Sequence, residues 1–279
     1  MFKNILFGID GSSFSDIACE YALDLAARLD ARLEAVHVVD SRVLEFPLLT
    51  PTPGCMAWAP FGLNELQQAL RSRGENLLRE TAARAEKTGV PILTTLEFGH
   101  PAQVLADIQT RTELVILGRQ GEHARNAPDI AGSTMDRFIR RATRPCLVTP
   151  AEFRPIQKIL VGVDGSASGS RALHEAAELA NALHIPLLIL AAAERENDEP
   201  TARRIVNEAH SLVRAHDCAA ASFITHGAPA LQILEQAAST NSDLIVLGSH
   251  GHGWIYDRLI GSVAAHVVSH SPVPVMLVR

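Results

Sequence analysis

The sequence KNILFGIDGS occupies residues 3 to 12, and a close copy, QKILVGVDGS, occupies residues 157 to 166. A second pair of matching segments follows in the same order, ELVILG at residues 113 to 118 and DLIVLG at residues 243 to 248. Self-similarity of this kind indicates a repeated structural unit. The chain is therefore predicted to consist of two copies of one domain.

The 279 residues suit two domains of about 140 residues each, which is a common domain size. Two prolines and several polar residues between 149 and 155 disfavour regular structure and mark the join. We place domain 1 at residues 1–151 and domain 2 at residues 152–279. The matching segments also indicate that domain 1 is longer by about 24 residues, and we assign this excess to a proline-rich stretch at about 41–63.

In each copy, short apolar runs alternate with longer segments of helical periodicity, as in βαβ units. Four runs are apolar at nearly every position, as parallel strands buried on both faces require, at residues 5–9, 114–117, 159–163 and 244–247. Five strands are expected per copy, and the second helix of each copy is expected at about 64–87 and 201–216. The predicted fold class is α/β, with two tandem Rossmann-like domains that each have a five-stranded parallel sheet and helices on both faces.

Hydrophobic residues make up 47% of the chain and charged residues 20%, which is typical of a globular protein. The formal net charge of −6 provides no basic field for a polyanion, so nucleic acid is not an expected partner. No apolar run reaches the roughly 18 residues of a membrane-spanning helix, and no cleavable signal is recognised. The four cysteines form no CxxC pair, which suggests neither disulfides nor a zinc site. We therefore expect a cytoplasmic protein that does not associate with membranes.

In open parallel sheets, a ligand binds beyond the carboxyl ends of the strands, where the strand order reverses. In domain 2 this place would lie between the loops that follow the strands ending near Asp164 and Gly248. Gly248 and Gly251 allow positive φ angles and close approach of the backbone to a ligand. Gly261 and Ser262 precede an apolar helix, whose first N–H groups and dipole favour an anion. These are the parts of a phosphate-binding cradle.

The spacing of these glycines matches, at every fixed position, the G-x2-G-x9-G-(S/T) motif of ATP-binding universal stress proteins. The chain resembles this family over both copies, and the resemblance implies ATP with Mg²⁺ as the ligand of domain 2. In the family, the aspartate that closes the first strand lies by the adenosine, the end of the second strand lines the adenine pocket, and the glycine motif holds the phosphates. The implied nucleotide-binding residues are Gly162, Asp164, Ala192, Gly248, Gly251, Gly261, Ser262 and Val263.

Domain 1 departs from this motif, because ten residues, including Pro128, separate Gly121 from Gly132 where domain 2 has nine. A second nucleotide site would therefore need a different loop path, and whether domain 1 binds nucleotide stays open. Its residues would be Asp10, Val38, Gly118, Gly121, Gly132 and Ser133.

The family usually dimerises through its last strand. The resemblance therefore implies that the apolar segments 145–148 and 274–278 pair within the chain as an internal pseudo-dimer. Such pairing would also hide strand edges that otherwise promote aggregation. Association of two chains into a homodimer is a further possibility.

Several of these residues also have simpler interpretations. Asp10 and Asp164 both precede Gly-Ser, so each could shape a turn and help to cap the following helix. His250 and His252 form an HxH pair without a nearby carboxylate or cysteine cluster, so no metal site is assigned. Arg119 could reach a phosphate or remain solvated. The stretch at 41–63 is unusually apolar for a loop, which favours packing or contact with a partner.

No GxxxxGK(S/T) loop, complete GxGxxG loop or GxSxG elbow occurs, and no catalytic residue is assigned. We therefore expect a regulatory protein in which ATP binding alters shape or association during the stress response, and not a metabolic enzyme. Two alternatives are an interaction scaffold that binds a lipid-like ligand or none, and an ATPase with slow turnover. The sequence identifies no protein partner.

Overall fold

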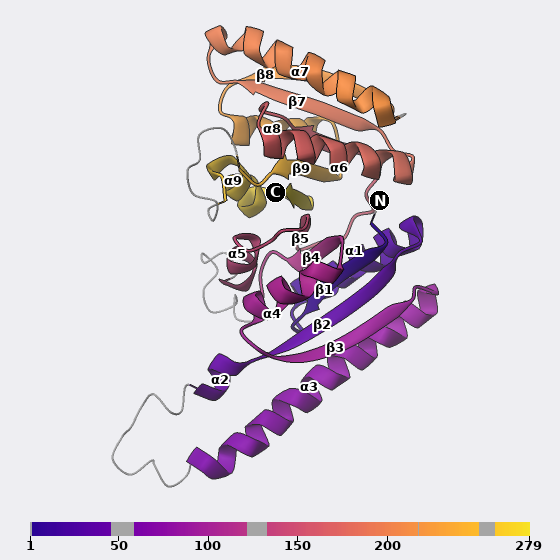
Figure 1. Ribbon diagram of the computed structural model, residues 1–279, viewed down its shortest axis with the longest axis vertical. Helices are drawn as coiled ribbons and strands as arrows, with labels where there is room; N and C mark the ends of the chain where they lie inside the picture. The colour runs from indigo at the N-terminus through magenta and orange to yellow at the C-terminus, as the bar shows by residue number, and fades with distance from the viewer. Residues whose placement is uncertain (1, 46–58, 122–132, 217, 251–259) are drawn as a thin grey trace, which may run out of the picture.

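Figure 1 shows a computed structural model of the chain, in which the two copies lie end to end and share one continuous sheet. The structure describes residues 2–45, 59–121, 133–216, 218–250 and 260–279. Domain 1 occupies the lower half of this view and domain 2 the upper half.

Each domain contributes five strands to the sheet. Those of domain 1 are β1 (Asn4–Ile9), β2 (Arg32–Asp40), β3 (Ile92–Gly99), β4 (Leu114–Gly118) and β5 (Cys146–Thr149). Those of domain 2 are β6 (Ile159–Gly162), β7 (Leu187–Ala193), β8 (Ala220–His226), β9 (Leu244–Gly248) and β10 (Val275–Val278). The strand order is β3-β2-β1-β4-β5-β10-β9-β6-β7-β8, and all neighbours within a domain run parallel. The predicted α/β class and the five parallel strands per copy are confirmed.

The helices lie on both faces of the sheet, as predicted. In domain 1 they are α1 (Ser13–Leu29), α2 (Ser41–Glu45), α3 (Ala59–Thr88), α4 (Pro101–Ile108) and α5 (Ser133–Ile139). In domain 2 they are α6 (Ala167–Leu183), α7 (Glu199–Val213), α8 (Pro229–Ser239) and α9 (Ser262–His270), with 3-10 turns η4 (Glu196–Asp198) and η5 (Arg214–His216). Among the described residues, no helix combines the length and apolar character needed to cross a membrane.

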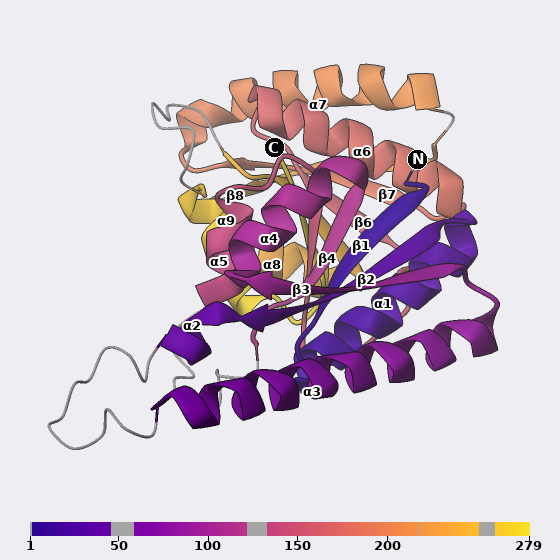
Figure 2. The same cartoon turned by 60° about the horizontal axis from the view of Figure 1, so that its bottom comes forward.

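Two hydrophobic cores run through both domains, one on each face of the sheet. Helices α1, α3, α6 and α7 bury their apolar residues on one face, and α4, α5, α8 and α9 do so on the other. Figure 2 shows α1 and α3 on the same side of the domain 1 sheet and α4 on the opposite side. Because both faces are covered, the central strands are apolar at consecutive positions, which is the pattern seen in the sequence.

The two domains are joined edge to edge by their last strands, which confirms the internal pseudo-dimer. Strand β10 pairs with β5 in an antiparallel register that places Met276 opposite Leu147. Both side chains are only 1% exposed, and they belong to the core that α1 and α6 cover. The junction is therefore part of the hydrophobic core and hides two strand edges from solvent.

The segment between β5 and β6 is held against α1 of domain 1. Tyr21 in α1 is fully buried, packs edge-on against Phe153 with ring centroids 4.8 Å apart, and accepts a hydrogen bond from the Arg154 N–H at 3.1 Å. Arg28 of the same helix donates to the Ile156 carbonyl at 2.8 Å. These contacts fix how the chain passes from one domain to the next.

Both described ends of the proline-rich stretch of domain 1 are helical. The second helix of this domain was expected to start at about residue 64, but α3 begins at Ala59 and has 30 residues, compared with 15 in α7. The prolines of this region had favoured irregular structure, but Pro60 lies in the first turn of α3, where a proline removes no intrahelical hydrogen bond. Residues 41–45 form α2. The rest of the proline-rich stretch, residues 46–58, lies outside the described part of the chain.

Two of the cysteines are buried as free thiols. Cys19 in α1 and Cys146 in β5 are 2% and 1% exposed. Burial raises the pKa of Cys19 to about 11 and that of Cys146 to about 12. Both side chains therefore stay protonated near neutral pH, and they act as packing groups rather than as nucleophiles or metal ligands.

Candidate functional site

The strand order reverses between β6 and β9 in domain 2. From β6 the chain moves outward through β7 to β8, and it then returns to β9 on the other side of β6. Asp164 follows the carboxyl end of β6, and Gly248 is the last residue of β9. The topology thus brings the two loops chosen from the sequence together at the place where open α/β sheets bind ligands.

The turn after β6 is built by Asp164, Gly165 and Ser166. Gly165 has φ +78°, a left-handed conformation that glycine adopts at little cost. The Asp164 Oδ1 atom accepts the Ser166 N–H at 2.9 Å. The Ser166 hydroxyl then accepts the Gly169 N–H at 3.0 Å as the N-cap of α6. Shaping this turn therefore uses one oxygen of the Asp164 carboxylate, and the carboxylate is exposed.

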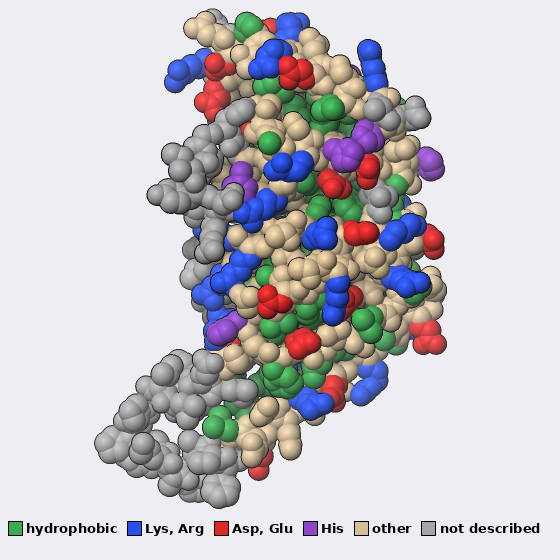
Figure 3. Space-filling view, in the orientation of Figure 1, with side chains coloured by type: hydrophobic (Ala, Val, Ile, Leu, Met, Phe, Trp, Pro, Cys, Tyr) green, Lys and Arg blue, Asp and Glu red, His purple; other side chains and the backbone are tan. Residues whose placement is uncertain are grey.

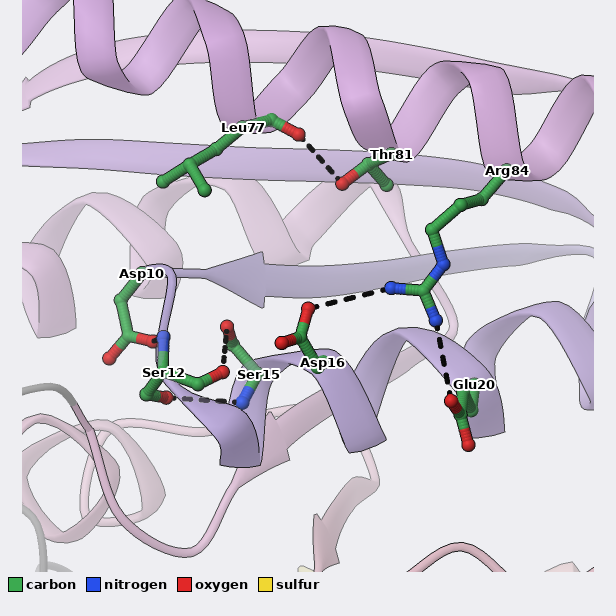
Figure 4. A network of polar contacts seen from close by, with 8 residues as sticks. All are labelled: Asp10, Ser12, Ser15, Asp16, Glu20, Leu77, Thr81 and Arg84. Carbon is green, nitrogen blue, oxygen red and sulfur yellow. Dashed lines mark hydrogen bonds and ion pairs between the residues drawn. The ribbon is translucent and has the colours of Figure 1, made fainter.

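Domain 1 has the same turn, which Figure 4 shows from close by. Gly11 has φ +82°, the Asp10 Oδ1 atom accepts the Ser12 N–H at 2.9 Å, and the Ser12 hydroxyl accepts the Ser15 N–H at 3.1 Å. Ser12 is the N-cap of α1. The repeated Asp-Gly-Ser therefore encodes a turn and a helix cap in both domains.

Gly248 brings the end of β9 against the first turn of α6. A Cβ atom at this position would lie 2.8 Å from the Gly169 nitrogen and 2.8 Å from the Ser168 carbonyl carbon. The Ser168 hydroxyl also donates a hydrogen bond to the His250 carbonyl oxygen. Gly248 is not among the described glycines with positive φ, so the expectation of a left-handed conformation at this position was wrong. Glycine is required at position 248 because the end of β9 packs closely against the backbone of α6. Gly251 lies outside the described residues.

Main-chain hydrogen bonds close the base of the loop between β9 and α9. The Ser249 N–H donates to the Val278 carbonyl at 2.7 Å, and the Gly261 N–H donates to the Ser249 carbonyl at 2.8 Å. Gly261 is buried and is the N-cap of α9, with φ −63° and ψ 147° and no side chain to cap the helix. Ser262 and Val263 follow in the first turn, where backbone N–H groups have no partner within the helix.

The remaining predicted residues of domain 2 line the strand ends beside this turn. Ala192 is the penultimate residue of β7 and is partly exposed. Gly162 ends β6, and a Cβ atom there would lie 2.7 Å from Leu247 Cδ2 and 3.3 Å from Ile233 Cδ1. Packing against β9 and α8 is therefore sufficient reason for glycine at position 162.

In the equivalent region of domain 1, two glycines have close neighbours. A Cβ atom at Gly121 would lie 2.8 Å from the Asp10 Oδ2 atom, so the loop after β4 comes close to this carboxylate. A Cβ atom at Gly11 would lie 3.2 Å from Arg73 Nη2 and 3.3 Å from Leu77 Cδ1, both of α3. The long helix α3 thus covers the turn after β1.

Two of the other predicted residues of domain 1 lie near the carboxyl ends of β2 and β4. Val38 is in β2 and is partly exposed, and Gly118 ends β4, where a Cβ atom would lie 2.8 Å from Phe14 Cβ. Ser133 is the first residue of α5, a helix of seven residues. Gly132 lies outside the described residues.

The side chain of Arg119, considered above as a phosphate ligand, crosses the domain junction. Its Nη1 atom donates to the Ser271 carbonyl at 2.8 Å and approaches the Ser269 and Val268 carbonyls at 3.4 and 3.5 Å. These carbonyls are at the carboxyl end of α9, where a positive charge is favourable. Partial burial lowers the pKa of the Arg119 guanidinium, which nevertheless stays charged at neutral pH. Arg119 of domain 1 therefore anchors the helix whose other end forms the candidate cradle.

Replacing Arg119 by alanine should lower the free energy of unfolding by about 1 kcal/mol, since a charge-assisted hydrogen bond at a helix end is lost. Urea unfolding followed by circular dichroism measures this loss. Arg195→Ala, which removes an exposed arginine beyond β7, is the matched control and should change stability by less than about 0.5 kcal/mol. Equal stability of the two variants would show that Arg119 contributes nothing to the junction.

Sequence reasoning missed Ser168 and Ser249, two buried serines that hold the base of the loop. A signal for Ser168 was present in the repeat, because the equivalent position of domain 1 is Phe14. Phenylalanine cannot donate a hydrogen bond to the loop, so the two copies differ at an anchoring position that the glycine motif does not include.

Comparisons with known proteins agree with this fold over the whole chain. The sequence profile described as Universal stress protein family matches residues 1–150 and 155–279. A universal stress protein of Synechocystis sp. is 28% identical over 287 residues, which cover 99% of this chain and 100% of the relative. One from Mycobacterium tuberculosis is 28% identical over 296 residues, which cover 99% and 96%.

A solved structure resembles the whole chain as well. The crystal structure of a universal stress protein from Archaeoglobus fulgidus covers 99% of this chain and 98% of its own, with a TM-score of 0.74 and 20% identity. This likeness supports the fold. Because the family profile matches both halves of the sequence, the chain belongs to the universal stress protein family, with two copies of the family domain in tandem.

Proposed function

We propose that this protein is an ATP-binding regulator in which domain 2 holds the nucleotide. The observation that carries the proposal is the arrangement around Gly261. Its N–H closes the loop onto Ser249, and the first-turn amides of α9 follow it directly, at the edge of the sheet where the strand order reverses. Backbone donors and a helix dipole at such a position favour a phosphate group.

The residues present also fit a bound Mg·ATP. Asp164 offers an exposed carboxylate next to the cradle, and Mg²⁺ bound to a nucleotide needs only one or two carboxylates besides phosphate oxygens and water. Ala192 is a small, partly exposed residue near the end of β7, where the family pattern places the adenine. ATP would then contact main-chain donors and small side chains, with no lysine clamp on the phosphates.

The differences between the domains favour unequal use of the two copies. In domain 1, Gly121 comes close to Asp10, and Arg73 and Leu77 of α3 lie over Gly11. These side chains and this loop lie in the region that a nucleotide would need. We therefore assign the principal site to domain 2 and regard domain 1 as a second, dispensable one.

We infer a regulatory role during stress, because the described residues of the site offer binding groups without a paired nucleophile and base. The cytoplasm is the proposed location. ATP hydrolysis, where it occurs, would be slow. A nucleotide bound by α9 would act on the domain junction, since Arg119 holds the other end of this helix. Association of two chains into a homodimer is part of this proposal. A scaffold without nucleotide is the alternative, and no observation on the described residues favours it.

The proposal is tested by the substitution Gly261→Asp. The backbone angles at position 261, φ −63° and ψ 147°, are ones that any residue can adopt, and aspartate is a favourable N-cap that should preserve α9. The new carboxylate would occupy the amides and repel phosphate. ATP affinity, measured by calorimetry with Mg²⁺, should fall at least about tenfold, while the melting temperature is kept.

Gly261→Asn is the matched control, because asparagine caps the helix equally well but carries no charge. It should lose less affinity than the aspartate variant. Mass analysis of small molecules released from the purified wild-type protein should detect an adenine nucleotide. No released nucleotide and no ATP binding by the wild type would favour the scaffold alternative.

A further inference from the structure

Two histidines and a glutamate meet on the outer face of domain 2, away from the nucleotide site. His174 and Glu178 are one turn apart on α6, and His216 is the last residue of η5 after α7. Nitrogen and carboxylate oxygen atoms of the three residues lie within 4.8 Å of one another. Figure 3 shows histidine side chains close together on the surface at the level of α6 and α7.

The two rings are placed as a pair of metal ligands. His174 Nδ1 and His216 Nε2 are hydrogen-bonded at 3.1 Å, and the rings meet edge to face with centroids 4.7 Å apart. A metal ion bound by both nitrogens would replace the proton that they share. Two imidazole nitrogens bound to one tetrahedral Zn²⁺ at about 2.0–2.1 Å are about 3.3 Å apart. The observed separation of the two nitrogens is therefore within a few tenths of an ångström of the distance in a zinc site, on one exposed and one half-buried histidine.

Glu178 orients the first of these rings. Its Oε1 atom lies 3.3 Å from His174 Nε2, the nitrogen on the opposite side of the ring from His216. A carboxylate at this distance favours the tautomer that carries its proton on Nε2. The lone pair of His174 is then on Nδ1 and faces His216. Carboxylates commonly hold metal-ligating histidines in this way.

Space for the other ligands of an ion is also present. His174 and His216 both line a pocket of about 220 Å³ between α6 and the end of α7, together with Ser170, Arg171, Leu173, Ala177, Leu212 and Val213. Water molecules in this pocket can complete a coordination shell that has two protein ligands. Such an open shell implies modest affinity and a metal that exchanges readily.

We propose that His174 and His216 bind a divalent transition-metal ion, with Zn²⁺ as the representative, and that Glu178 positions His174 from outside the coordination shell. Imidazole ligands select ions such as Zn²⁺, Ni²⁺ and Cu²⁺ over Mg²⁺ and Ca²⁺. The ion would link the carboxyl end of the α7–η5 segment to the middle of α6. This site does not depend on the proposed nucleotide function, and it was not indicated by the sequence, because His174 and His216 lie far apart in the chain.

The test is a titration of the full chain with ZnCl₂, without nucleotide, in competition with a chromogenic chelator. The wild type should bind Zn²⁺ at this site, and Co²⁺ should give a visible absorption band. His174→Gln and His216→Gln should each weaken Zn²⁺ binding at least tenfold. Glu178→Gln should weaken it by about tenfold, since outer-shell partners typically contribute that much to affinity.

A matched control distinguishes this site from other surface histidines. His266 and His270 on α9 stack with ring centroids 4.1 Å apart and form a second histidine pair. The variant His270→Gln should keep wild-type Zn²⁺ affinity. The proposal is overturned if the wild type binds no Zn²⁺ at 100-fold molar excess, or if Zn²⁺ affinity is unchanged in His174→Gln and His216→Gln, whatever the effect of His270→Gln. Unchanged melting temperatures exclude misfolding as the cause of any loss.

Discussion

Replacing Met276 by aspartate is expected to lower the free energy of unfolding by about 4 kcal/mol or more. Met276 is 1% exposed and lies opposite Leu147 across the antiparallel junction of β10 and β5. An aspartate there would place an unpaired charge in the core shared by both domains. Urea unfolding should therefore show either a large fall in midpoint or two separate transitions, because the domains would no longer unfold together.

The control for this prediction is Met276→Leu, which keeps the volume of the side chain and its apolar character. It should cost less than about 1.5 kcal/mol. If Met276→Asp unfolded within about 1 kcal/mol of the wild type in a single transition, the junction would not be buried as the structure describes. The continuous ten-stranded sheet would then be wrong.

The second large effect is expected for Gly248→Ala. The new Cβ atom would lie 2.8 Å from backbone atoms of both Ser168 and Gly169, which cannot move without shifting the first turn of α6. Overpacking of this kind typically costs about 1–3 kcal/mol. The Ser168 hydroxyl would also lose its contact with the His250 carbonyl, so the ATP affinity of domain 2 should fall together with stability.

Gly62→Ala supplies the comparison. Gly62 lies within α3, and nothing approaches within 4 Å of a Cβ atom placed there. Alanine should stabilise the helix by about 0.5–1 kcal/mol. Urea unfolding of the two variants thus compares the same glycine-to-alanine change at two positions. The free energy of unfolding should fall for Gly248→Ala and rise for Gly62→Ala. A Gly248→Ala variant as stable as the wild type would show that β9 does not pack against α6 as described.

Much of the fold could be predicted from the sequence, because its signals are local and occur twice. The apolar runs at 114–117 and 244–247 agree with β4 and β9 to within a residue, since strands buried on both faces leave little choice of side chain. The repeat gave the tandem arrangement. The start of α3 was misplaced because prolines were interpreted as loop signals, although a proline is well tolerated in the first turn of a helix.

The candidate site was harder to predict, because its geometry depends on contacts between distant segments. Gly248 was proposed as a nucleotide-binding residue, which stays a prediction, and the structure gives this last residue of β9 a steric role that involves Ser168, a residue outside the glycine motif. Arg119 was considered as a phosphate ligand, yet it reaches α9 across a junction that the sequence does not describe. The residue types indicated the chemistry of the candidate site. The contacts of each residue depend on how distant segments pack, within domain 2 for Gly248 and across the junction for Arg119.

The central claim is that the first-turn amides of α9 hold the phosphates of ATP. Amide NMR of isotope-labelled protein, recorded with and without Mg·ATP, tests it most directly. The account predicts large shifts for Gly261, Ser262 and Val263, with smaller shifts near Asp164 and little change in α5. Saturable binding of ATP that leaves the amides of residues 261–263 unchanged would contradict it.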